Sequence, residues 1–170
     1  NLVRRAMADG HSCVVYDPQA QAVADLAAEG ATGTSSLADL VAALPAPRAV
    51  WVMVPAGHIT DAVVTELIGL LEPGDCLIDG GNSYYRDDIR RGQAAAAKGL
   101  DYLDVGTSGG VWGRERGYCL MIGGADASVD RLTPLWDTIA PGVHAAERTP
   151  GRDGDPSPAE RGWLHCGPNG

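Results

Sequence analysis

Short runs of consecutive apolar residues alternate along the chain with longer stretches in which apolar residues recur at helical spacing. Continuous apolar runs are typical of strands buried on both faces, and the spaced pattern is typical of helices that pack one face on a sheet. This alternation predicts an α/β fold, a doubly wound parallel sheet with helices on both sides. The expected strands cover residues 12–17, 49–54, 76–79, 101–105 and 118–122, and the expected helices cover residues 18–29, 36–44, 59–71, 85–98 and 127–139.

Both ends of the chain interrupt that pattern. Residues 2–8 have the pattern of a helix that Gly10 closes, but no strand and no G-x-G-x-x-G loop precede them. Those two features normally open the sheet of a dinucleotide-binding domain. Residues 167–170 form a turn with no element behind it. We therefore expect residues 1–170 to be a Rossmann-like domain with a mostly parallel sheet, truncated at both ends and lacking its first strand and Gly-rich loop.

Charge and composition narrow the possible partners. The chain has 13 basic and 22 acidic residues, a formal net charge of -9 and a pI near 4.7. Nucleic acids and anionic membranes both select a basic protein surface, so we expect neither as a partner. No apolar run approaches the roughly 20 residues of a membrane span, and the chain does not open on a signal peptide.

Metal chemistry is not expected either. The four histidines show no ligand spacing, and the four cysteines are widely spaced without a C-x-x-C pair. Three of the cysteines lie in apolar stretches, which predicts buried free thiols. Free thiols indicate a reducing compartment, so we expect a cytoplasmic protein with no metal site. The cysteines are Cys13, Cys76, Cys119 and Cys166.

Candidate chemistry lies where the expected strands end. In a parallel sheet, ligands bind beyond the carboxyl ends of the strands. Here those ends are Asp17, the turn 54–57 and the loops 79–83 and 106–110, and three of the four are rich in glycine. Asp17 can accept hydrogen bonds from a ribose or can serve only as a turn former. The two later loops can bind an anion or can form only turns, so the residue types alone leave the function open.

A longer pattern across these loops is specific. Residues 77–91, with Asp-Gly-Gly-Asn-Ser-Tyr-Tyr at 79–85, resemble the signature of the decarboxylating 6-phosphogluconate dehydrogenases. Residues 53–57, 104–110 and 117–124 are similar to that family as well, so the resemblance spans essentially the whole chain. It implies an enzyme that oxidises 6-phosphogluconate at C3 with a nicotinamide cofactor. The keto acid then loses carbon dioxide to give ribulose 5-phosphate, in the pentose phosphate pathway.

The resemblance also implies roles for residues of this chain. Asn82 sits between cofactor and substrate, and the main-chain loop that follows the next strand holds the substrate. The implied cofactor contacts are Asp17, Val54, Pro55, Ala56 and Asn82, and the implied substrate contacts are Asn82, Ser108, Gly109 and Gly110.

The resemblance places the proton-transfer chemistry outside these residues. The family's proton-shuttling lysine and its glutamate proton donor lie past the position of Gly170, as does the all-helical domain that builds the dimer. The only lysine here is Lys98, which aligns within the helix after the Asn82 loop. We therefore expect no catalytic residue in residues 1–170, no activity from them alone, and a complete enzyme that is a homo-oligomer.

The residues after the first expected strand indicate the cofactor. Family members that use NADP carry Asn-Arg-Thr there, with the arginine on the 2′-phosphate, whereas this chain has Asp17-Pro18-Gln19. A carboxylate repels a 2′-phosphate, and residues 111–113 also resemble the NAD-using branch, so we expect NAD rather than NADP. Two alternatives remain. One is another β-hydroxyacid dehydrogenase of the same superfamily, acting on a smaller substrate, and the other is a non-catalytic nucleotide-binding module.

Overall fold

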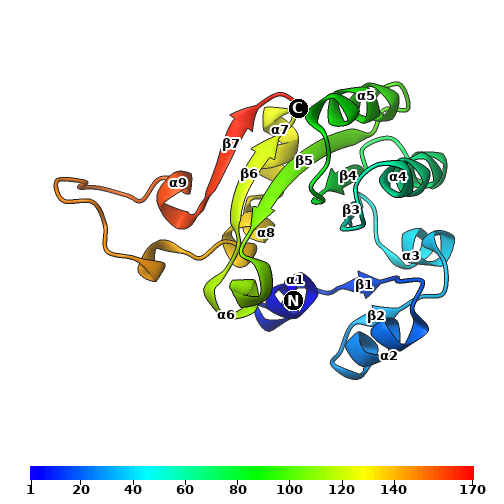
Figure 1. Cartoon of the computed structure of the whole chain (residues 1–170), viewed down its shortest axis with the longest axis horizontal. Coiled ribbons are helices and arrows are strands. Elements are labelled where there is room, and N and C mark those ends of the chain that lie inside the picture. The colour runs from blue at the N-terminus through cyan, green and yellow to red at the C-terminus, as the bar shows by residue number, and fades with distance from the viewer.

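Seven strands form two sheets in the computed structural model, which describes residues 1–170 (Figure 1). β1 (Val14–Val15) and β2 (Thr32–Gly33) pair in parallel as a small separate sheet. The main sheet has the order β3-β4-β5-β6-β7, and only the β5–β6 pair is antiparallel. The expected α/β fold with a mostly parallel sheet is therefore confirmed. The strands of the main sheet are β3 (Ala49–Val52), β4 (Cys76–Asp79), β5 (Asp101–Ser108), β6 (Cys119–Gly123) and β7 (Trp163–Gly167).

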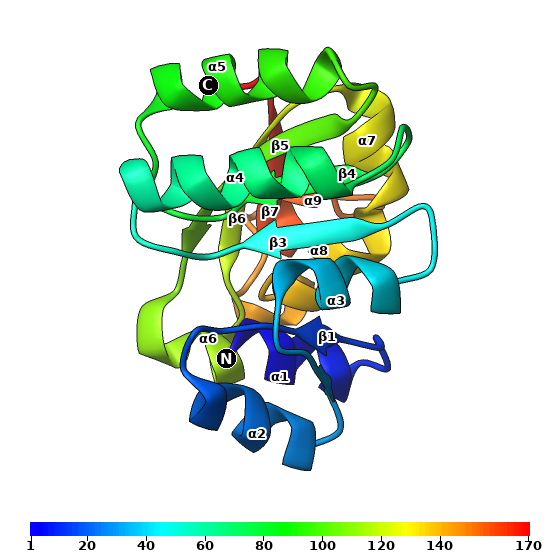
Figure 2. The same ribbon diagram turned by 90° about the vertical axis from the view of Figure 1, so that its right-hand side faces the viewer.

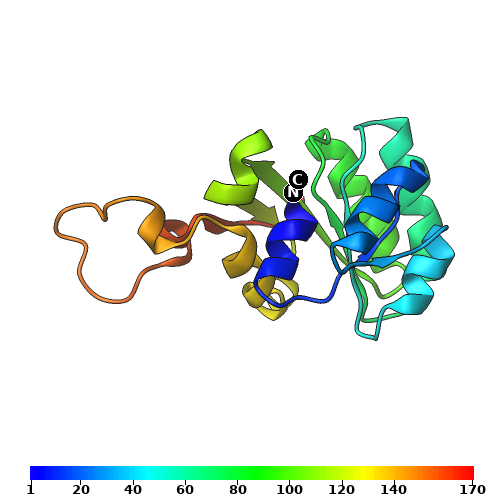
Figure 3. The same cartoon turned by 90° about the horizontal axis from the view of Figure 1, so that it is seen from below.

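Helices cover both faces of the main sheet. Figure 2 shows one group in front of the strands, and Figure 3 shows the second group on their other side. The first group is α3 (Leu37–Ala43), α4 (His58–Leu70) and α5 (Tyr85–Ala96), and the second is α1 (Leu2–Ala8), α7 (Asp126–Arg131) and α8 (Thr133–Ile139). The remaining elements are α2 (Ala20–Ala28), α6 (Gly113–Arg116), α9 (Pro158–Arg161) and the 3-10 turns η1 (Gly110–Trp112) and η2 (Val143–Ala145).

Two apolar cores lie on the two faces, because successive side chains of a strand point to opposite sides. In β4, Ile78 joins the core that contains Trp136 of α8, whereas Leu77 joins the core that contains Leu67 of α4. All four of these residues are fully buried. The continuous apolar run 76–78 is thus explained by burial on both faces, as expected for a doubly wound sheet.

Local sequence signals set the starts of the helices that matter for the site. The Ser36 hydroxyl accepts a hydrogen bond from the Asp39 amide at 3.0 Å, which caps α3 at the expected position. Asp87 and Asp88 stand in the first turn of α5, where negative charge favours the positive end of the helix dipole. No helix has the length and apolar character that a bilayer crossing requires.

Some expected elements differ in extent from the observed ones. The expected strand 12–17 is reduced to β1, and the expected helix 127–139 is divided at Leu132 into α7 and α8, because Pro134 in the first turn of α8 has no amide proton to continue the earlier helix. β5 runs on to Ser108 because antiparallel pairing with β6 extends it. β2 and β7 are strands that the pattern did not predict.

Burial is confirmed for only one of the three cysteines expected to be buried. All four thiols are free, but only Cys76 is buried; Cys13 is half-buried, and Cys119 and Cys166 are exposed. The two exposed thiols belong to β6 and β7, on a face where Met121 and Leu164 are also exposed. On this side of the sheet the helices α3, α4 and α5 pack against β3, β4 and β5, and the core that they form contains no residue of β6 or β7.

Candidate functional site

Two loops at the carboxyl ends of β3 and β4 lie against each other. A Cβ atom placed on Gly81 would lie 3.2 Å from the carbonyl oxygen of Val54, so the loop after β4 touches the turn after β3. The buried Thr60 hydroxyl at the start of α4 donates to the carbonyl oxygen of Pro55 at 2.9 Å and fixes that turn. Val54 is half-buried, while Pro55 and Ala56 are exposed. The structure thus brings the expected cofactor turn next to the loop that carries Asn82.

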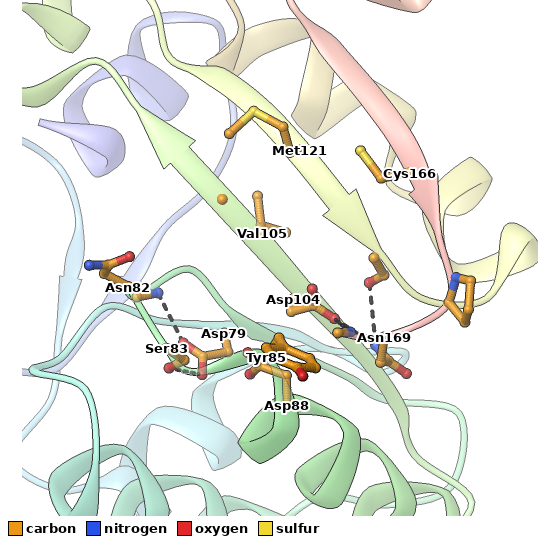
Figure 4. Close-up of a pocket in the computed structure, with 15 residues that line it drawn as sticks. Asp79, Asn82, Ser83, Tyr85, Asp88, Asp104, Val105, Met121, Cys166 and Asn169 are labelled. Carbon is orange, nitrogen blue, oxygen red and sulfur yellow. Dashed lines mark hydrogen bonds between the residues drawn. The ribbon is translucent and has the colours of Figure 1, made fainter.

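Asn82 is exposed, and the residues on either side of it are held by one carboxylate. Asp79, the last residue of β4, accepts a hydrogen bond from the Gly81 amide at Oδ1 (2.9 Å) and another from the Ser83 hydroxyl at Oδ2 (2.7 Å). Figure 4 shows the Asn82 side chain directed away from Asp79, with its amide group free of these contacts. The loop therefore presents an amide that can both donate and accept hydrogen bonds.

A buried cluster of charged and polar groups lies beneath this loop. Arg91 of α5 donates from Nη1 to Asp79 Oδ2 at 3.1 Å and from Nε to Asp61 Oδ1 of α4 at 2.9 Å. The Tyr102 hydroxyl donates to Asp88 Oδ1 at 3.0 Å and lies 3.4 Å from Asp79 Oδ2. Asp79, Asp88, Arg91 and Tyr102 are each at most 5% exposed, so water does not replace these contacts.

Burial changes the acid–base properties of this cluster. Removal from water, together with the nearby charges of Asp79 and Asp104, raises the pKa of the Asp88 carboxyl to about 7. Burial also raises the pKa of Tyr102, so its hydroxyl stays a proton donor. Burial alone would lower the pKa of Arg91, but the hydrogen bond to Asp61 and the surrounding carboxylates outweigh it, and Arg91 stays charged.

A cavity of about 530 Å³ opens beside the loop (Figure 4). Asn82 lines it on one side, Met121 of β6 and Cys166 of β7 line it on another, and Asp104 of β5 lies between. Asp104 Oδ1 accepts from Asn169 Nδ2 at 3.2 Å and from the Gly170 amide at 3.0 Å, which fastens the last residues of the chain to the cavity wall.

The other expected site residues lie outside this cavity. Ser108 ends β5 opposite Cys119, and Gly109 and Gly110 follow at the start of η1. Asp17 is exposed, and its Oδ1 accepts a hydrogen bond from the Gln19 amide at 2.7 Å. This hydrogen bond closes a turn of the kind that the Asp-Pro pair predicts. It uses only one of the two carboxylate oxygens of Asp17.

Packing within the protein explains two of the glycines in the strand-end loops. A Cβ atom on Gly80 would overlap the indole nitrogen of Trp51, and one on Gly109 would lie 2.8 Å from the Tyr118 ring. The Trp51 nitrogen is buried and has no hydrogen-bond partner. Close packing of an aromatic side chain therefore accounts for these two positions, whereas nothing lies within 4 Å of a Cβ on Gly110.

Sequence reasoning did not identify Asp79, Arg91, Tyr102 and Asp88 as a unit. Asp79 was visible as a strand-end residue, and the Arg91 position lies within the family-like run 77–91. An acidic residue as the last member of an otherwise apolar strand is the signal that could have found the cluster, because a carboxylate buried at such a place needs partners.

Comparisons with known proteins agree with these features. Residues 1–146 match the family model described as the NAD binding domain of 6-phosphogluconate dehydrogenase. The chain is 43% identical over 141 residues to an NAD(+)-dependent, decarboxylating 6-phosphogluconate dehydrogenase of Haloferax volcanii. That alignment covers 83% of this chain and 46% of the Haloferax protein. The chain is 40% identical over 145 residues to the decarboxylating enzyme of Treponema pallidum, covering 82% and 30%. The chain thus spans about half or less of the length of these curated relatives.

Solved structures share the fold at lower identity. A Plasmodium falciparum 6-phosphogluconate dehydrogenase, solved with NADP+ and with 6-phosphogluconate, matches with a TM-score of 0.80 and 24% identity over 99% of this chain and 34% of that one. A Mycobacterium tuberculosis 3-hydroxyisobutyrate dehydrogenase also has a TM-score of 0.80, with 23% identity over 99% and 50%. These likenesses show the Rossmann-like fold of dehydrogenase domains and do not by themselves choose a substrate.

Proposed function

Because this chain belongs to the family of NAD-binding domains of 6-phosphogluconate dehydrogenase, we propose that it binds NAD in an enzyme that converts 6-phosphogluconate to ribulose 5-phosphate. The observation that carries the proposal is the presentation of Asn82. Its amide is exposed at the end of β4, next to the Val54 turn and at the edge of a cavity of about 530 Å³. An exposed amide that can both donate and accept hydrogen bonds suits a group placed between a cofactor and a polyhydroxy acid.

The residues present fit a dinucleotide with an unmodified ribose. Asp17 keeps one carboxylate oxygen unused after its contact with the Gln19 amide, and that oxygen can accept from ribose hydroxyls. Arg4, a cation in α1, pairs with Glu29 at 2.6 Å, and this ion pair would have to open before Arg4 could bind a 2′-phosphate. When bound, NAD would accept a hydride from the substrate. In this chain Val54, Pro55 and Ala56 would orient the cofactor.

The substrate side is proposed to use the end of β5. Ser108, Gly109 and Gly110 are exposed and offer a hydroxyl and backbone amides, which suit the anionic groups of 6-phosphogluconate on a protein of net charge -9. Local hydrogen-bond donors of this kind offset the repulsion between the anionic substrate and the negative net charge of the protein.

We propose that the proton-transferring residues lie outside residues 1–170. Lys98 is exposed and follows the far end of α5, a helix of 12 residues. At 1.5 Å per residue, that helix separates Lys98 from the Asn82 loop by roughly 18 Å. Exposed Met121 and Leu164 leave the β6–β7 face open to further protein, which supports a homo-oligomeric enzyme. Its cytoplasmic location and its place in the pentose phosphate pathway are proposed from the family alone.

The divided sheet supports the expectation of one more strand in the domain. β1 and β3 are neighbours in Figures 1 and 2, yet no backbone pairing joins them. A parallel strand between them would satisfy both edges, and the loop after it would supply backbone amides for a pyrophosphate.

Calorimetric titration of the complete gene product with NAD and with NADP tests the cofactor assignment. We expect NAD to bind at least about tenfold more tightly, a difference of about 1.4 kcal/mol. Equal or tighter binding of NADP would contradict the assignment to NAD, and binding of neither would contradict the proposed function.

A further inference from the structure

We propose that Asp79 is a positioning residue for Asn82, acting through the two neighbours of Asn82 and held in turn by Arg91 and Tyr102. The inference rests on the proposed function, in which Asn82 contacts cofactor and substrate. It adds a set of buried residues that fix the geometry of Asn82, and one of them, Asp79, also lines the cavity beside Asn82.

The first step is that Asp79 holds the residues on both sides of Asn82. The Gly81 amide donates to Asp79 Oδ1 at 2.9 Å, and the Ser83 hydroxyl donates to Oδ2 at 2.7 Å. Each carboxylate oxygen therefore holds one of the two residues that flank Asn82, while Asn82 itself is exposed. A loop held on both sides of an exposed residue loses the freedom to turn that residue away from its ligand, which is the purpose of preorganisation.

The second step is that Asp79 cannot move independently. Its Oδ2 atom also accepts from Arg91 Nη1 at 3.1 Å, and the Tyr102 hydroxyl lies 3.4 Å away. The side chains of Asp79 and Arg91 are 1% and 2% exposed, so each needs the other to avoid an unpaired buried charge. The carboxylate is thereby fixed between α5 and β5.

The third step connects the second loop. Arg91 Nε donates to Asp61 Oδ1 at 2.9 Å, and Asp61 stands in the first turn of α4, directly after the turn 54–57. Arg91 Nη2 lies at the same distance from that oxygen but outside hydrogen-bonding geometry. One arginine therefore links the helix behind the cofactor turn to the carboxylate behind the Asn82 loop.

A second buried carboxylate, that of Asp75, serves as a control for Asp79 because its role is confined to stability. Asp75 is also buried and also pairs with an arginine, Arg48 Nη1, at 2.9 Å, while it accepts from the Arg48 and Glu72 amides. That pair lies at the start of β4, at the opposite end of the strand from Asn82. Loss of the Asp75 carboxylate should reduce stability without affecting the geometry of the Asn82 loop.

Ser83→Ala in the complete gene product is the test that leaves every buried charge in place. We expect kcat for 6-phosphogluconate oxidation to fall by about 10- to 100-fold, with the KM for NAD changed less than about threefold, because a displaced reacting group costs turnover more than binding. Ser83→Thr keeps the hydroxyl and should restore most of kcat. Ser36→Ala, which removes the cap of α3 and no hydrogen bond of the Asn82 loop, should leave both constants unchanged.

Asp79→Asn and Asp75→Asn, compared at a temperature where both are folded, separate positioning from stability. We expect both to lower Tm and only Asp79→Asn to lower kcat. A wild-type protein that does not oxidise 6-phosphogluconate overturns the proposed function and this inference with it. An active wild type together with unchanged kcat in Ser83→Ala, or equal loss of kcat in Ser83→Ala and Ser36→Ala, overturns the inference alone.

Discussion

The hydroxyl of Tyr102 donates a hydrogen bond to the buried carboxyl of Asp88 at 3.0 Å, directly beneath the loop that carries Asn82. The pair joins the central strand β5 to α5, and both groups are withdrawn from water. Burial of the carboxyl and, next to it, the charges of Asp79 and Asp104 raise the pKa of Asp88 to about 7, although the hydrogen bond from Tyr102 acts in the opposite direction.

Asp88→Asn should remove a pH dependence of stability. The pKa of Asp88 is raised to about 7 in the folded protein from an ordinary value near 4, so the folded state holds a proton that the unfolded state has lost. This stabilising contribution is present below about pH 4 and is lost as the pH rises through about 7. We expect the free energy of unfolding of the wild type to fall by on the order of 2 kcal/mol between about pH 5 and about pH 7, relative to Asp88→Asn.

Denaturant titrations across that pH range measure the difference. Asp87→Asn is the matched control, because Asp87 is the neighbouring acid on the exposed side of α5 and pairs with Arg90. A wild type and an Asp88→Asn protein with parallel pH profiles would show that Asp88 is ionised in the folded protein at neutral pH.

Gly80→Ala should destabilise the domain through Trp51. The added methyl group would overlap the Trp51 indole nitrogen, and overpacking of a buried site costs about 1–3 kcal/mol. Gly69→Ala is the control, because Gly69 lies in α4 with nothing within 4 Å of its Cβ position, and it should stabilise by about 0.5–1 kcal/mol.

Thermal unfolding of both variants and of the double variant Gly80→Ala/Trp51→Leu tests the cause. Gly80→Ala should cost less stability in the Trp51→Leu background than in the wild type, because the smaller side chain leaves room for the added methyl group. An equal cost in both backgrounds would show that the overlap with Trp51 is not the reason for the glycine.

Asp17→Asn should narrow the preference for NAD over NADP. The amide oxygen keeps the turn by accepting from the Gln19 amide, but the negative charge that opposes a 2′-phosphate is removed. We expect the ratio of kcat/KM for NAD to that for NADP to fall by about tenfold, equivalent to about 1.4 kcal/mol. Asp25→Asn, on the exposed surface of α2, should leave the ratio unchanged; a similar fall in both variants would point to general surface charge.

The sequence pattern predicts β3 and β4 most directly because side chains of these strands enter the apolar cores on both faces of the sheet. Residues 49–52 and 76–78 are continuous apolar runs, and each became a strand at that place. The two-residue strand β2 (Thr32–Gly33) has no apolar run, since both its residues are exposed, so nothing in the pattern could indicate it. Antiparallel pairing of β5 with β6 depends on tertiary packing that periodicity does not report.

The candidate site is predicted only in part for a similar reason. Asn82 and the Val54 turn are recognisable because their loops follow strand ends and lie in runs that resemble a known family, and the structure places these loops in contact. Asp79 and Arg91 are 12 residues apart, and Asp61 is on another helix, so their pairing exists only after α4 and α5 pack side by side. The glycine-rich loop after β4 is visible in the sequence, but the close approach of Trp51 to Gly80 depends on the fold.

Reduction of NAD by the complete gene product with 6-phosphogluconate as the only substrate tests the central proposal most directly, with carbon dioxide release measured in the same reaction. We predict NADH and carbon dioxide in equal amounts, no comparable rate with 3-hydroxyisobutyrate, and a kcat/KM that is higher with NAD than with NADP. NADH formed from 3-hydroxyisobutyrate but not from 6-phosphogluconate, or no NADH from either, would contradict the proposed function.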